Sequence, residues 1–255
     1  MSHPTRVCYG RRVINTLPML LTTRSALFLD FDGTLAELAP RPDAVVVTRE
    51  LLSLLERLRE RLDGALALVT GRAQADIEPL IAPLHLPAAF EHGAVRRSAS
   101  GATTRARSPE LGPALAVAQA LAARHSGLLV EHKLTALALH FRAAPQLEAE
   151  CTAAMSAAIR HDPGLQLLRG KAVVEVKSAS VGKGLAIAAF MAEPPFAGRL
   201  PLFAGDDVTD EPGFDAVQRL GGAGIKVGSG DTCARHRIAH PQALQRWLSD
   251  TAETL

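Results

Sequence analysis

The residues most able to do chemistry in this sequence are Asp30 and Asp32, two acids at the end of an apolar run. Residues 26–29 predict a short strand buried on both faces. Because side chains alternate along a strand, the two carboxylates can point the same way, where they need a cation or a shared proton. One could attack phosphorus to form an aspartyl-phosphate, while the other donates a proton to the leaving oxygen. The alternative is a simple strand-to-turn junction at Asp32-Gly33.

Polar residues also follow two other apolar runs in the chain. Thr70 follows the run 65–69, and its hydroxyl could donate to a phosphoryl oxygen or cap the next helix. Arg72 could add positive charge at the same rim. The run 200–204 predicts another buried strand, and the acidic segment 205–211 follows it directly.

These acids favour a metal site made of oxygen ligands. The carboxyl ends of parallel strands share one edge of a sheet, so Asp206 can approach Asp30 there, with Asp207 beside it. Oxygen ligands alone suit Mg²⁺, which would relieve the repulsion between acids and offset the charge of a phosphate. Lys183, at the start of a predicted helix, could add a second positive charge. The alternative for this loop is calcium binding or helix capping, although the EF-hand spacing is lacking.

Composition limits the classes of function. The chain has 255 residues, of which 47% are hydrophobic and 21% charged, enough for one large domain or two modest ones. A net charge of +2 and only 4% aromatic residues give no case for nucleic acid or for a membrane surface, and no apolar run is long enough to span a bilayer. Three widely spaced cysteines, without a metal-binding pattern, predict reduced thiols in a cytoplasmic protein.

The order of predicted elements indicates a split domain. Residues 25–103 and 178–255 alternate between buried strands and helices, which predicts an α/β fold with a parallel sheet. Residues 104–177 instead read as helix, strand, strand, twice, which predicts a small two-layer α/β domain inserted between the two halves. Residues 1–24 form an N-terminal extension with several arginines and no acid, to which we assign no chemistry.

Several polar residues have two interpretations. Residues 88–95 predict an interrupted third strand, where His92 could contact a substrate or be satisfied by the backbone as an ordinary loop histidine. Glu131 and Lys133 are expected between two strands of the inserted domain, and Glu175 near a strand end. A solvated charged rim is the simplest interpretation of these three residues.

The sequence resembles the phosphatases of the haloacid dehalogenase (HAD) superfamily. The resemblance lies in four motifs: Asp30-Phe31-Asp32-Gly33-Thr34, Thr70, Lys183 and Gly205-Asp206-Asp207. Within that superfamily the chain is similar to the trehalose-6-phosphate phosphatases, and the similarity runs from residue 26 to about residue 228. The stretches that carry this narrower similarity include Glu91-His92-Gly93, Glu131-His132-Lys133, His140-Phe141-Arg142 and Glu175-Val176-Lys177.

The resemblance implies a Mg²⁺-dependent phosphatase with a HAD-type Rossmann-like core and an inserted α/β cap domain. It implies hydrolysis of trehalose 6-phosphate, a small sugar phosphate, in trehalose biosynthesis. Asp30 would be the nucleophile and Asp32 the general acid and then base, while Thr70 and Lys183 would hold the phosphoryl group. The metal ligands would be Asp30, the backbone carbonyl of Asp32, Asp206 and Asp207, with Asp210 in support. The substrate contacts would be Gly33, Thr34, Arg72, His92, Glu131, Lys133, Arg142 and Glu175.

Other functions share parts of this pattern. A related capped phosphatase could act on another sugar phosphate, such as sucrose phosphate or mannosylglycerate phosphate. A non-catalytic regulatory relative of a synthase–phosphatase pair could have lost Asp30, Asp32 or Asp206, and all three are present. A phosphomutase would carry the same four motifs. Whether a trehalose-6-phosphate synthase binds as a partner is left open, and Phe31, where the family often has tyrosine, is expected to face away from the site.

Overall fold

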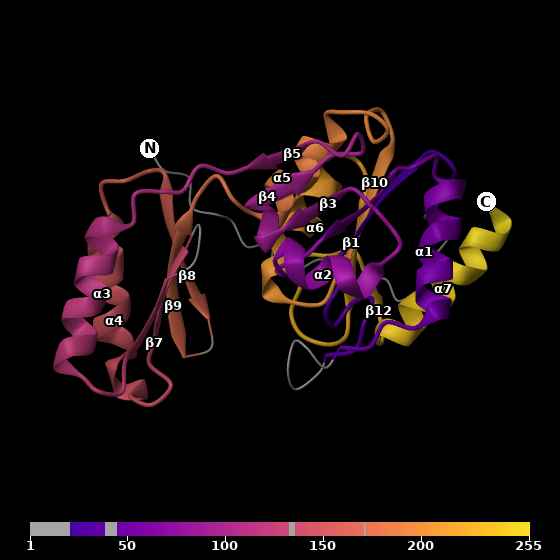
Figure 1. Cartoon of the computed structure of the whole chain (residues 1–255). Coiled ribbons are helices and arrows are strands. Elements are labelled where there is room, and N and C mark those ends of the chain that lie inside the picture. The colour runs from indigo at the N-terminus through magenta and orange to yellow at the C-terminus, as the bar shows by residue number, and fades with distance from the viewer. Residues whose placement is uncertain (1–20, 39–44, 133–135, 171) are drawn as a thin grey trace. The chain divides into compact units, whose positions relative to one another are not determined.

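The chain folds into two compact units. The computed structural model describes residues 21–38, 45–132, 136–170 and 172–255 (Figure 1). One unit, which we call the core unit, comprises Met1–Arg105 and Gly182–Leu255, and the other, the inserted unit, comprises Ala106–Val181. Lys133 and most of the expected N-terminal extension lie outside the described residues.

The core unit is built on one large, mainly parallel sheet. Eight strands of the described residues form it in the order β12-β11-β10-β1-β2-β3-β4-β5. The strands from β12 to β3 in this order are parallel to their neighbours, and β4 and β5 are antiparallel. Their bounds are β1 (Ser25–Leu29), β2 (Leu66–Val69), β3 (Ala88–Phe90), β4 (Val95–Arg97), β5 (Thr103–Arg105), β10 (Leu200–Gly205), β11 (Ala223–Val227) and β12 (His236–Ile238).

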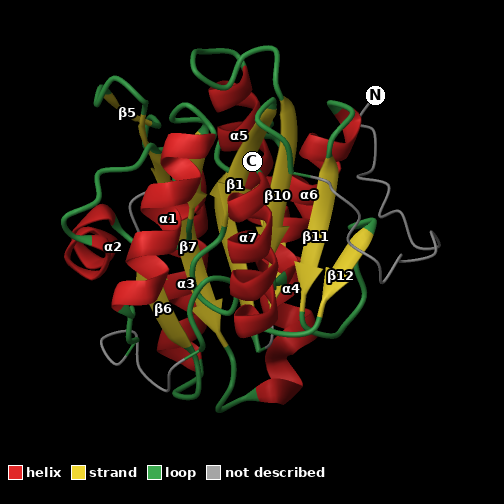
Figure 2. Ribbon diagram, turned by 90° about the vertical axis from the view of Figure 1, so that its right-hand side faces the viewer, coloured by secondary structure: helices red, strands yellow, loops and turns green. Residues whose placement is uncertain are grey.

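Continuous apolar runs form the central strands because helices cover both faces of the sheet (Figure 2). Every residue of β1 and of β2 is buried. In the view of Figure 2, α1 and α7 lie in front of the sheet, and α5 and α6 lie behind it. The core-unit helices are α1 (Arg49–Arg61), α2 (Gln74–Ile81), α5 (Lys183–Met191), α6 (Glu211–Arg219) and α7 (Pro241–Thr254).

Helix α1 shows how local sequence sets these elements. The side chain of Thr48 accepts a hydrogen bond from the backbone N–H of Leu51 at 3.2 Å, as expected of an N-cap residue. Leucines at helical spacing bury one face of the helix. Asp63 and Gly64 then take positive φ angles of 49° and 80°, which ends the helical run and leads the chain into β2.

The strand order places a topological switch beside β1. The chain winds from β1 to β2 and β3 in one direction, and from β10 to β11 and β12 in the other. Strands β1 and β10 pair directly, with Leu29 opposite Ala204. In open α/β sheets, ligands bind at the carboxyl ends of strands where the winding reverses. The residues that follow β1 and β10 therefore lie at the position in this fold best suited to bind a ligand.

Three local expectations for the core unit were wrong or incomplete. Residues 88–95 do not form one interrupted strand, because β4 turns back antiparallel to β3. The reversal is built from Glu91 and His92, both at positive φ, followed by Gly93. Residues 241–248 predict the last helix from the sequence, and α7 extends beyond them to Thr254, whereas the sequence indicated neither α6 nor β12.

The inserted unit is a two-layer α/β structure. Four of its described strands form an antiparallel sheet in the order β6-β7-β9-β8, and its two helices lie side by side along one face (Figure 1). The expected order of helix, strand, strand, repeated once, is confirmed. Glu131 lies within β6, so the expectation that it links two strands was wrong. The bounds are α3 (Gly112–Arg124), β6 (Leu129–His132), β7 (Ala136–His140), α4 (Glu148–Ile159), β8 (Leu165–Gly170) and β9 (Val173–Ser178).

Within the described part of the chain, no helix is both long and apolar enough to cross a membrane.

Candidate active site

Three strands of the core sheet end in polar residues at one edge. Asp30 follows β1, Thr70 follows β2 and Asp206 follows β10. Oxygens of Asp30, Asp206 and Asp210 all lie within 4.8 Å of one another. The structure thus brings Asp206 close to Asp30, which stands 176 positions earlier in the sequence, as the parallel-sheet argument predicts.

Asp30 is held in a buried ionic network with Lys183 and Asp210. Lys183 is the first residue of α5, and its Nζ lies 2.8 Å from Asp30 Oδ1 and 2.6 Å from Asp210 Oδ1. The three residues are 5%, 3% and 0% exposed. Burial raises the pKa of Asp30 well above its usual value, against the opposing charge of Lys183. Burial alone would lower the pKa of Lys183, but the two carboxylates outweigh it and raise that pKa.

Asp210 organises the acidic loop rather than offering free oxygens. Its Oδ2 accepts hydrogen bonds from the backbone N–H groups of Asp206 and Asp207, each at 2.9 Å. In return the Asp207 side chain accepts from the backbone of Asp210, which completes a capping box. A Cβ on Gly205 would lie 2.4 Å from Asp210 Cγ, so this close approach requires glycine. Asp210 therefore fixes both the loop and Lys183.

Asp206 faces the turn that follows β1. Thr34 Oγ1 donates to Asp206 Oδ1 at 3.1 Å. Gly33 has a φ of +71°, and a Cβ there would lie 2.2 Å from Asp206 Oδ2, so neither the backbone conformation nor the space admits a side chain. Burial raises the pKa of Asp206, and the charge of Asp210 adds to the effect. Gly33 and Thr34 thus belong to the walls of this acidic site.

Sequence reasoning missed Lys226, which also belongs to the site. Its side chain donates to the backbone carbonyl of Asp206, although the residue sits in β11 and is only 5% exposed. The signal for it was a lysine inside the apolar run Ala223–Val227, because a charged residue is rarely buried without a partner. Lys183 and Lys226 together give two positive charges against the three buried or half-buried acids.

The donor set fits a hard divalent cation. Asp210 already uses both carboxylate oxygens for Lys183 and for the loop, which leaves Asp30 and Asp206 as the carboxylates best able to bind a metal. Burial raises the pKa of both acids, and a bound cation would favour their ionised forms. The three clustered acids suggest metal binding. The exposed Asp207, whose carboxylate caps the loop, stays a predicted ligand.

Asp32 is paired with Arg72, an arrangement that the sequence did not predict. Arg72 Nε lies 2.7 Å from Asp32 Oδ2, and Arg72 Nη2 lies 2.7 Å from Asp32 Oδ1. The Arg72 guanidinium also lies over the ring of Phe31, 5.7 Å from its centroid. Phe31 itself is fully buried in the core cluster.

Thr70 and His92 support the same corner of the sheet. Thr70 is buried, and its Oγ1 accepts a hydrogen bond from the backbone N–H of Arg72 at 3.1 Å, so Thr70 does not cap α2. The backbone N–H of His92 donates to the carbonyl of Thr70 at 2.9 Å. A Cβ on Gly71 would lie 2.7 Å from the His92 ring, which places the imidazole directly against this turn. The strained φ of His92, +58°, lies beside the predicted site, as strain often does.

The inserted unit carries the other predicted substrate residues on its sheet. Glu131 and Glu175 lie opposite Ala138 on its two sides, and all three point away from the apolar cluster that packs under α3 and α4. Glu131 Oε2 lies 3.0 Å from His140 Nε2. Arg142 is exposed in the turn that follows β7. Glu131 and Glu175 thus share one face of this sheet, as sugar contacts would require.

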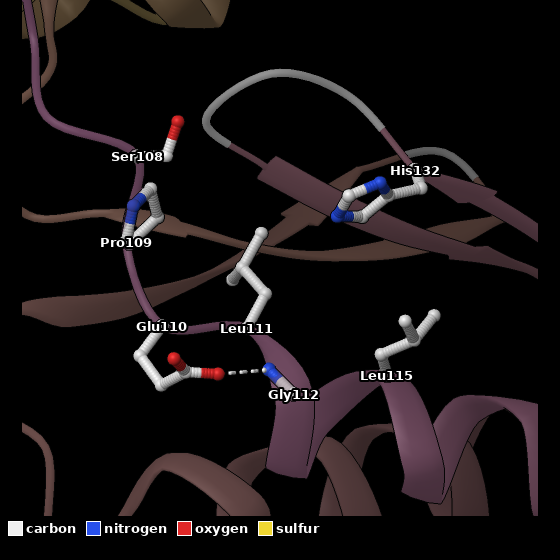
Figure 3. Close-up of a pocket in the computed structure, with 7 residues that line it drawn as sticks. All are labelled: Ser108, Pro109, Glu110, Leu111, Gly112, Leu115 and His132. Atoms are coloured by element: carbon white, nitrogen blue, oxygen red, sulfur yellow. Dashed lines mark hydrogen bonds between the residues drawn. The ribbon is translucent and has the colours of Figure 1, made fainter.

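A cavity of about 590 Å³ in the inserted unit lies elsewhere (Figure 3). It opens between the start of α3 and the end of β6, where His132 faces Leu115 and the Glu110 side chain accepts a hydrogen bond from Gly112 N–H at 3.0 Å. Because side chains alternate along β6, His132 and Glu131 point to opposite faces of the sheet. This cavity therefore contains none of the residues predicted to contact substrate.

Comparison with known proteins agrees with this geometry. The chain is 43% identical over 235 residues to the trehalose-6-phosphate phosphatase of Escherichia coli (strain K12), covering 89% of this chain and 86% of that protein. A solved structure of Aspergillus fumigatus trehalose-6-phosphate phosphatase matches with a TM-score of 0.76 and 26% identity, over 94% of this chain and 99% of that one. A HAD-like hydrolase from B. subtilis shares the fold, with a TM-score of 0.65 and 14% identity, over 88% of this chain and 98% of the other.

The fold class expected from the sequence is therefore confirmed as a HAD-type α/β fold. The profile of the trehalose-phosphatase family matches residues 28–245, which include the acidic edge of the core sheet and the whole inserted unit. This chain belongs to the trehalose-phosphatase family.

Proposed function

We propose that this protein hydrolyses trehalose 6-phosphate to trehalose and inorganic phosphate. The observation that carries the proposal is the placement of Asp30. This acid ends the central strand β1, lies 2.8 Å from Lys183 Nζ and shares an oxygen cluster with Asp206. A metal site and a buried lysine beside one carboxylate suit attack on a phosphate dianion, because both offset its negative charge. The name of the E. coli relative, at 43% identity, supplies the sugar.

The proposed reaction has two steps. In the first, a carboxylate oxygen of Asp30 bonds to phosphorus, the ester P–O bond breaks, and the leaving sugar oxygen takes a proton from Asp32. In the second, Asp32 takes a proton from water as that water attacks phosphorus. The acyl-phosphate P–O bond then breaks, which releases phosphate and restores the Asp30 carboxylate. One water is consumed per turnover, and both acids end in their starting states.

Mg²⁺ is the cation we propose for the acidic edge. Asp30, Asp206 and the backbone carbonyl of Asp32 would hold it, with Asp207 as a further predicted ligand, because all of them offer hard oxygen ligands. When bound, it would neutralise charge on the phosphoryl oxygens. Lys183 and Thr70 would hold the remaining oxygens of the phosphoryl group, and Asp210 would keep Lys183 and the metal loop in place.

We assign recognition of the sugar to the inserted unit. Glu131 and Glu175 lie on the strands on either side of Ala138. Two carboxylate acceptors therefore flank a small side chain on the same face of the sheet. Carboxylates accept hydrogen bonds from sugar hydroxyls, and each such charged–neutral bond is worth about 1.5–3 kcal/mol. Arg142 and Lys133 would add donors, although Lys133 lies outside the described residues.

The free thiols of Cys151 and Cys233 suit a protein of the reducing cytoplasm.

The test is phosphate release from a panel of esters by the purified protein with Mg²⁺. The panel contains trehalose 6-phosphate, sucrose 6-phosphate, mannosylglycerate phosphate and glucose 6-phosphate. We expect the highest kcat/KM for trehalose 6-phosphate. If another sugar phosphate is hydrolysed faster, the substrate assignment is wrong but the proposed phosphatase mechanism stands. If the product is an isomerised sugar phosphate and no phosphate is released, the protein is a mutase. Binding without turnover would indicate a regulatory domain.

A further inference from the structure

The ion pair between Arg72 and Asp32 is the most specific side-chain arrangement at the site that the proposed reaction leaves unexplained. Two hydrogen bonds of 2.7 Å join one edge of the guanidinium to both oxygens of the carboxylate. Such a bidentate pair fixes the orientation of the carboxylate as well as its position. Arg72 has a raised pKa, for which its hydrogen bond to Asp32 is the main cause.

Arg72 is itself fixed by contacts on several sides. Its side chain is only 10% exposed, against 31% for Asp32. The ring of Phe31 lies beneath the guanidinium, and such cation–π contacts favour a planar, weakly hydrated cation. Its backbone N–H donates to Thr70 Oγ1, and its carbonyl accepts from the N–H of Glu91 at 2.9 Å. Arg72 is therefore a rigid support for the more exposed acid.

Asp32 needs such a support because of where it lies. It stands between the buried Phe31 and Gly33, whose φ of +71° starts a turn, so the backbone alone does not fix its side chain. An acid that transfers protons at a leaving oxygen must be placed to within about 0.5 Å of the productive position. A misplacement of about 1 Å can lower a rate 100-fold.

We propose that Arg72 is a positioning residue that acts through Asp32, rather than a ligand of the phosphate. This inference rests on the proposed function, in which Asp32 transfers the protons. In the first step the protonated acid would keep one hydrogen bond from Arg72, at its carbonyl oxygen, while its O–H points to the leaving oxygen, and the carboxylate that remains would accept both hydrogen bonds again. Asp32 accepts the hydrogen bonds of Arg72 Nε and Nη2. These are the two donors that a bidentate contact with a phosphate would use. Phe31 takes part as the platform for the guanidinium, so its ring matters to the site even though it is buried in the core.

Leaving groups of different basicity test this role. A sugar alkoxide leaves poorly and needs the proton from Asp32, whereas p-nitrophenolate leaves well without it. The value kcat/KM reports the first step, in which the ester bond breaks. For Arg72→Ala we expect kcat/KM for trehalose 6-phosphate to fall about 10- to 100-fold, which is part of the roughly 10²–10⁴-fold that general acid catalysis supplies, because Asp32 itself is still present. The loss for p-nitrophenyl phosphate should stay below about threefold, because little acid catalysis is at stake.

The Arg72→Lys variant separates fork geometry from charge. Lysine keeps the positive charge but cannot form the planar two-point contact. Positioning through Asp32 predicts that Arg72→Lys remains impaired on trehalose 6-phosphate, with an unchanged inhibition constant for inorganic phosphate. Direct binding of phosphate predicts that lysine largely restores activity and that Arg72→Ala weakens inhibition by phosphate. The second pair of results would overturn the inference.

A matched control measures the cost of losing an ion pair of the same type. Arg97 is similarly buried, pairs with Glu78 and lies over the ring of Phe90, 5.5 Å from its centroid. Arg97→Ala should leave the ratio of the two kcat/KM values unchanged. If Arg72→Ala does not fold, Arg72→Lys carries the same comparison.

The decisive measurement is a double-mutant cycle between Arg72 and Asp32. If Arg72 acts through Asp32, then Arg72→Ala should add less than about twofold to the loss already caused by Asp32→Asn, because coupled residues are not additive. Losses that multiply, or equal losses on both esters, would overturn the positioning role. Failure of the wild-type protein to hydrolyse trehalose 6-phosphate would instead overturn the proposed function, and the cycle would then be run on the sugar phosphate that it does hydrolyse.

Discussion

The acidic edge of the core sheet and the polar face of the inserted sheet use similar residues in opposite surroundings. At the core edge, Lys183 joins two carboxylates, and all three residues are almost fully buried. On the inserted sheet, Glu131 pairs with His140, and their side chains are 49% and 35% exposed. One network is closed to water and the other is open to it.

This difference suggests a division of work. A buried ionic network has a high desolvation cost and tolerates few changes, since removing one partner leaves an unpaired buried charge. It therefore suits the part of a substrate that never varies, the phosphate. An exposed pair contributes little to stability and can change freely. It suits the part that differs between substrates, the sugar.

The largest effect should come from Asp30→Asn in the core unit. An amide does not attack phosphorus, so we expect turnover to fall below detection on every phosphate ester. The measurement is steady-state phosphate release with trehalose 6-phosphate and with p-nitrophenyl phosphate. Asp63→Asn, at an exposed acid paired with Arg199, is the matched control and should keep full activity. Near wild-type turnover by Asp30→Asn would exclude the covalent mechanism.

Removing the metal should affect both esters nearly as strongly. We expect a chelator to abolish activity and Mg²⁺ to restore it, because Asp30 and Asp206 would otherwise repel a phosphate dianion. Asp206→Asn should raise the Mg²⁺ concentration for half activity by more than the roughly 10- to 100-fold typical of outer-shell changes. The fold should survive, since a neutral amide removes repulsion from Asp210.

The control for that variant is Asp215→Asn, in an exposed pair with Arg219. It should leave the Mg²⁺ requirement unchanged. Full activity of the wild-type protein after exhaustive metal removal would show that Lys183 and Lys226 suffice, and the metal proposal would then be wrong.

The contrast between the two regions also explains what the sequence could reveal. The strands that precede Asp30, Thr70 and Asp206 are continuous apolar runs. A parallel sheet brings the carboxyl ends of these strands to one edge, whatever the conformation of the connecting loops. The order of helices and strands in the inserted unit was predictable for the same reason, because it depends on local periodicity.

Long-range pairing and unusual backbone conformations could not be predicted. Arg72 and Asp32 lie 40 positions apart, and nothing in their spacing indicates a bidentate pair. The buried Lys226 donates a hydrogen bond to the backbone carbonyl of Asp206, 20 positions earlier in the chain. The reversal after β3 depends on Glu91 and His92, whose backbones have positive φ angles. Few residues other than glycine adopt this left-handed conformation.

A smaller, substrate-selective effect should come from the acids of the inserted unit. Glu131→Ala and Glu175→Ala should each lower kcat/KM for trehalose 6-phosphate by roughly 10- to 200-fold, the worth of one charged hydrogen bond. Hydrolysis of p-nitrophenyl phosphate, which has no sugar, should fall far less. Lys133→Ala should behave in the same way.

Glu150→Ala is the control for these variants, because Glu150 is an exposed acid on α4 of the same unit, paired with Arg124. It should change neither rate. Equal losses on both esters for Glu131→Ala and Glu175→Ala would mean that these acids form a structural rim, which was the simplest interpretation of the sequence.

The smallest effect should come from His140→Ala. The ring lies 3.0 Å from Glu131 and can orient that carboxylate, but an exposed pair is worth at most about 1 kcal/mol, so kcat/KM for trehalose 6-phosphate should fall no more than about fivefold. The loss should disappear in the Glu131→Ala background, because the effect passes through that acid. His125→Ala is the control, since His125 lies 4.0 Å from Glu150 at similar exposure and should have no effect. A loss from His140→Ala as large as that from Glu131→Ala would mean that the exposed face is as tightly organised as the buried edge, and the proposed division between the two regions would fail.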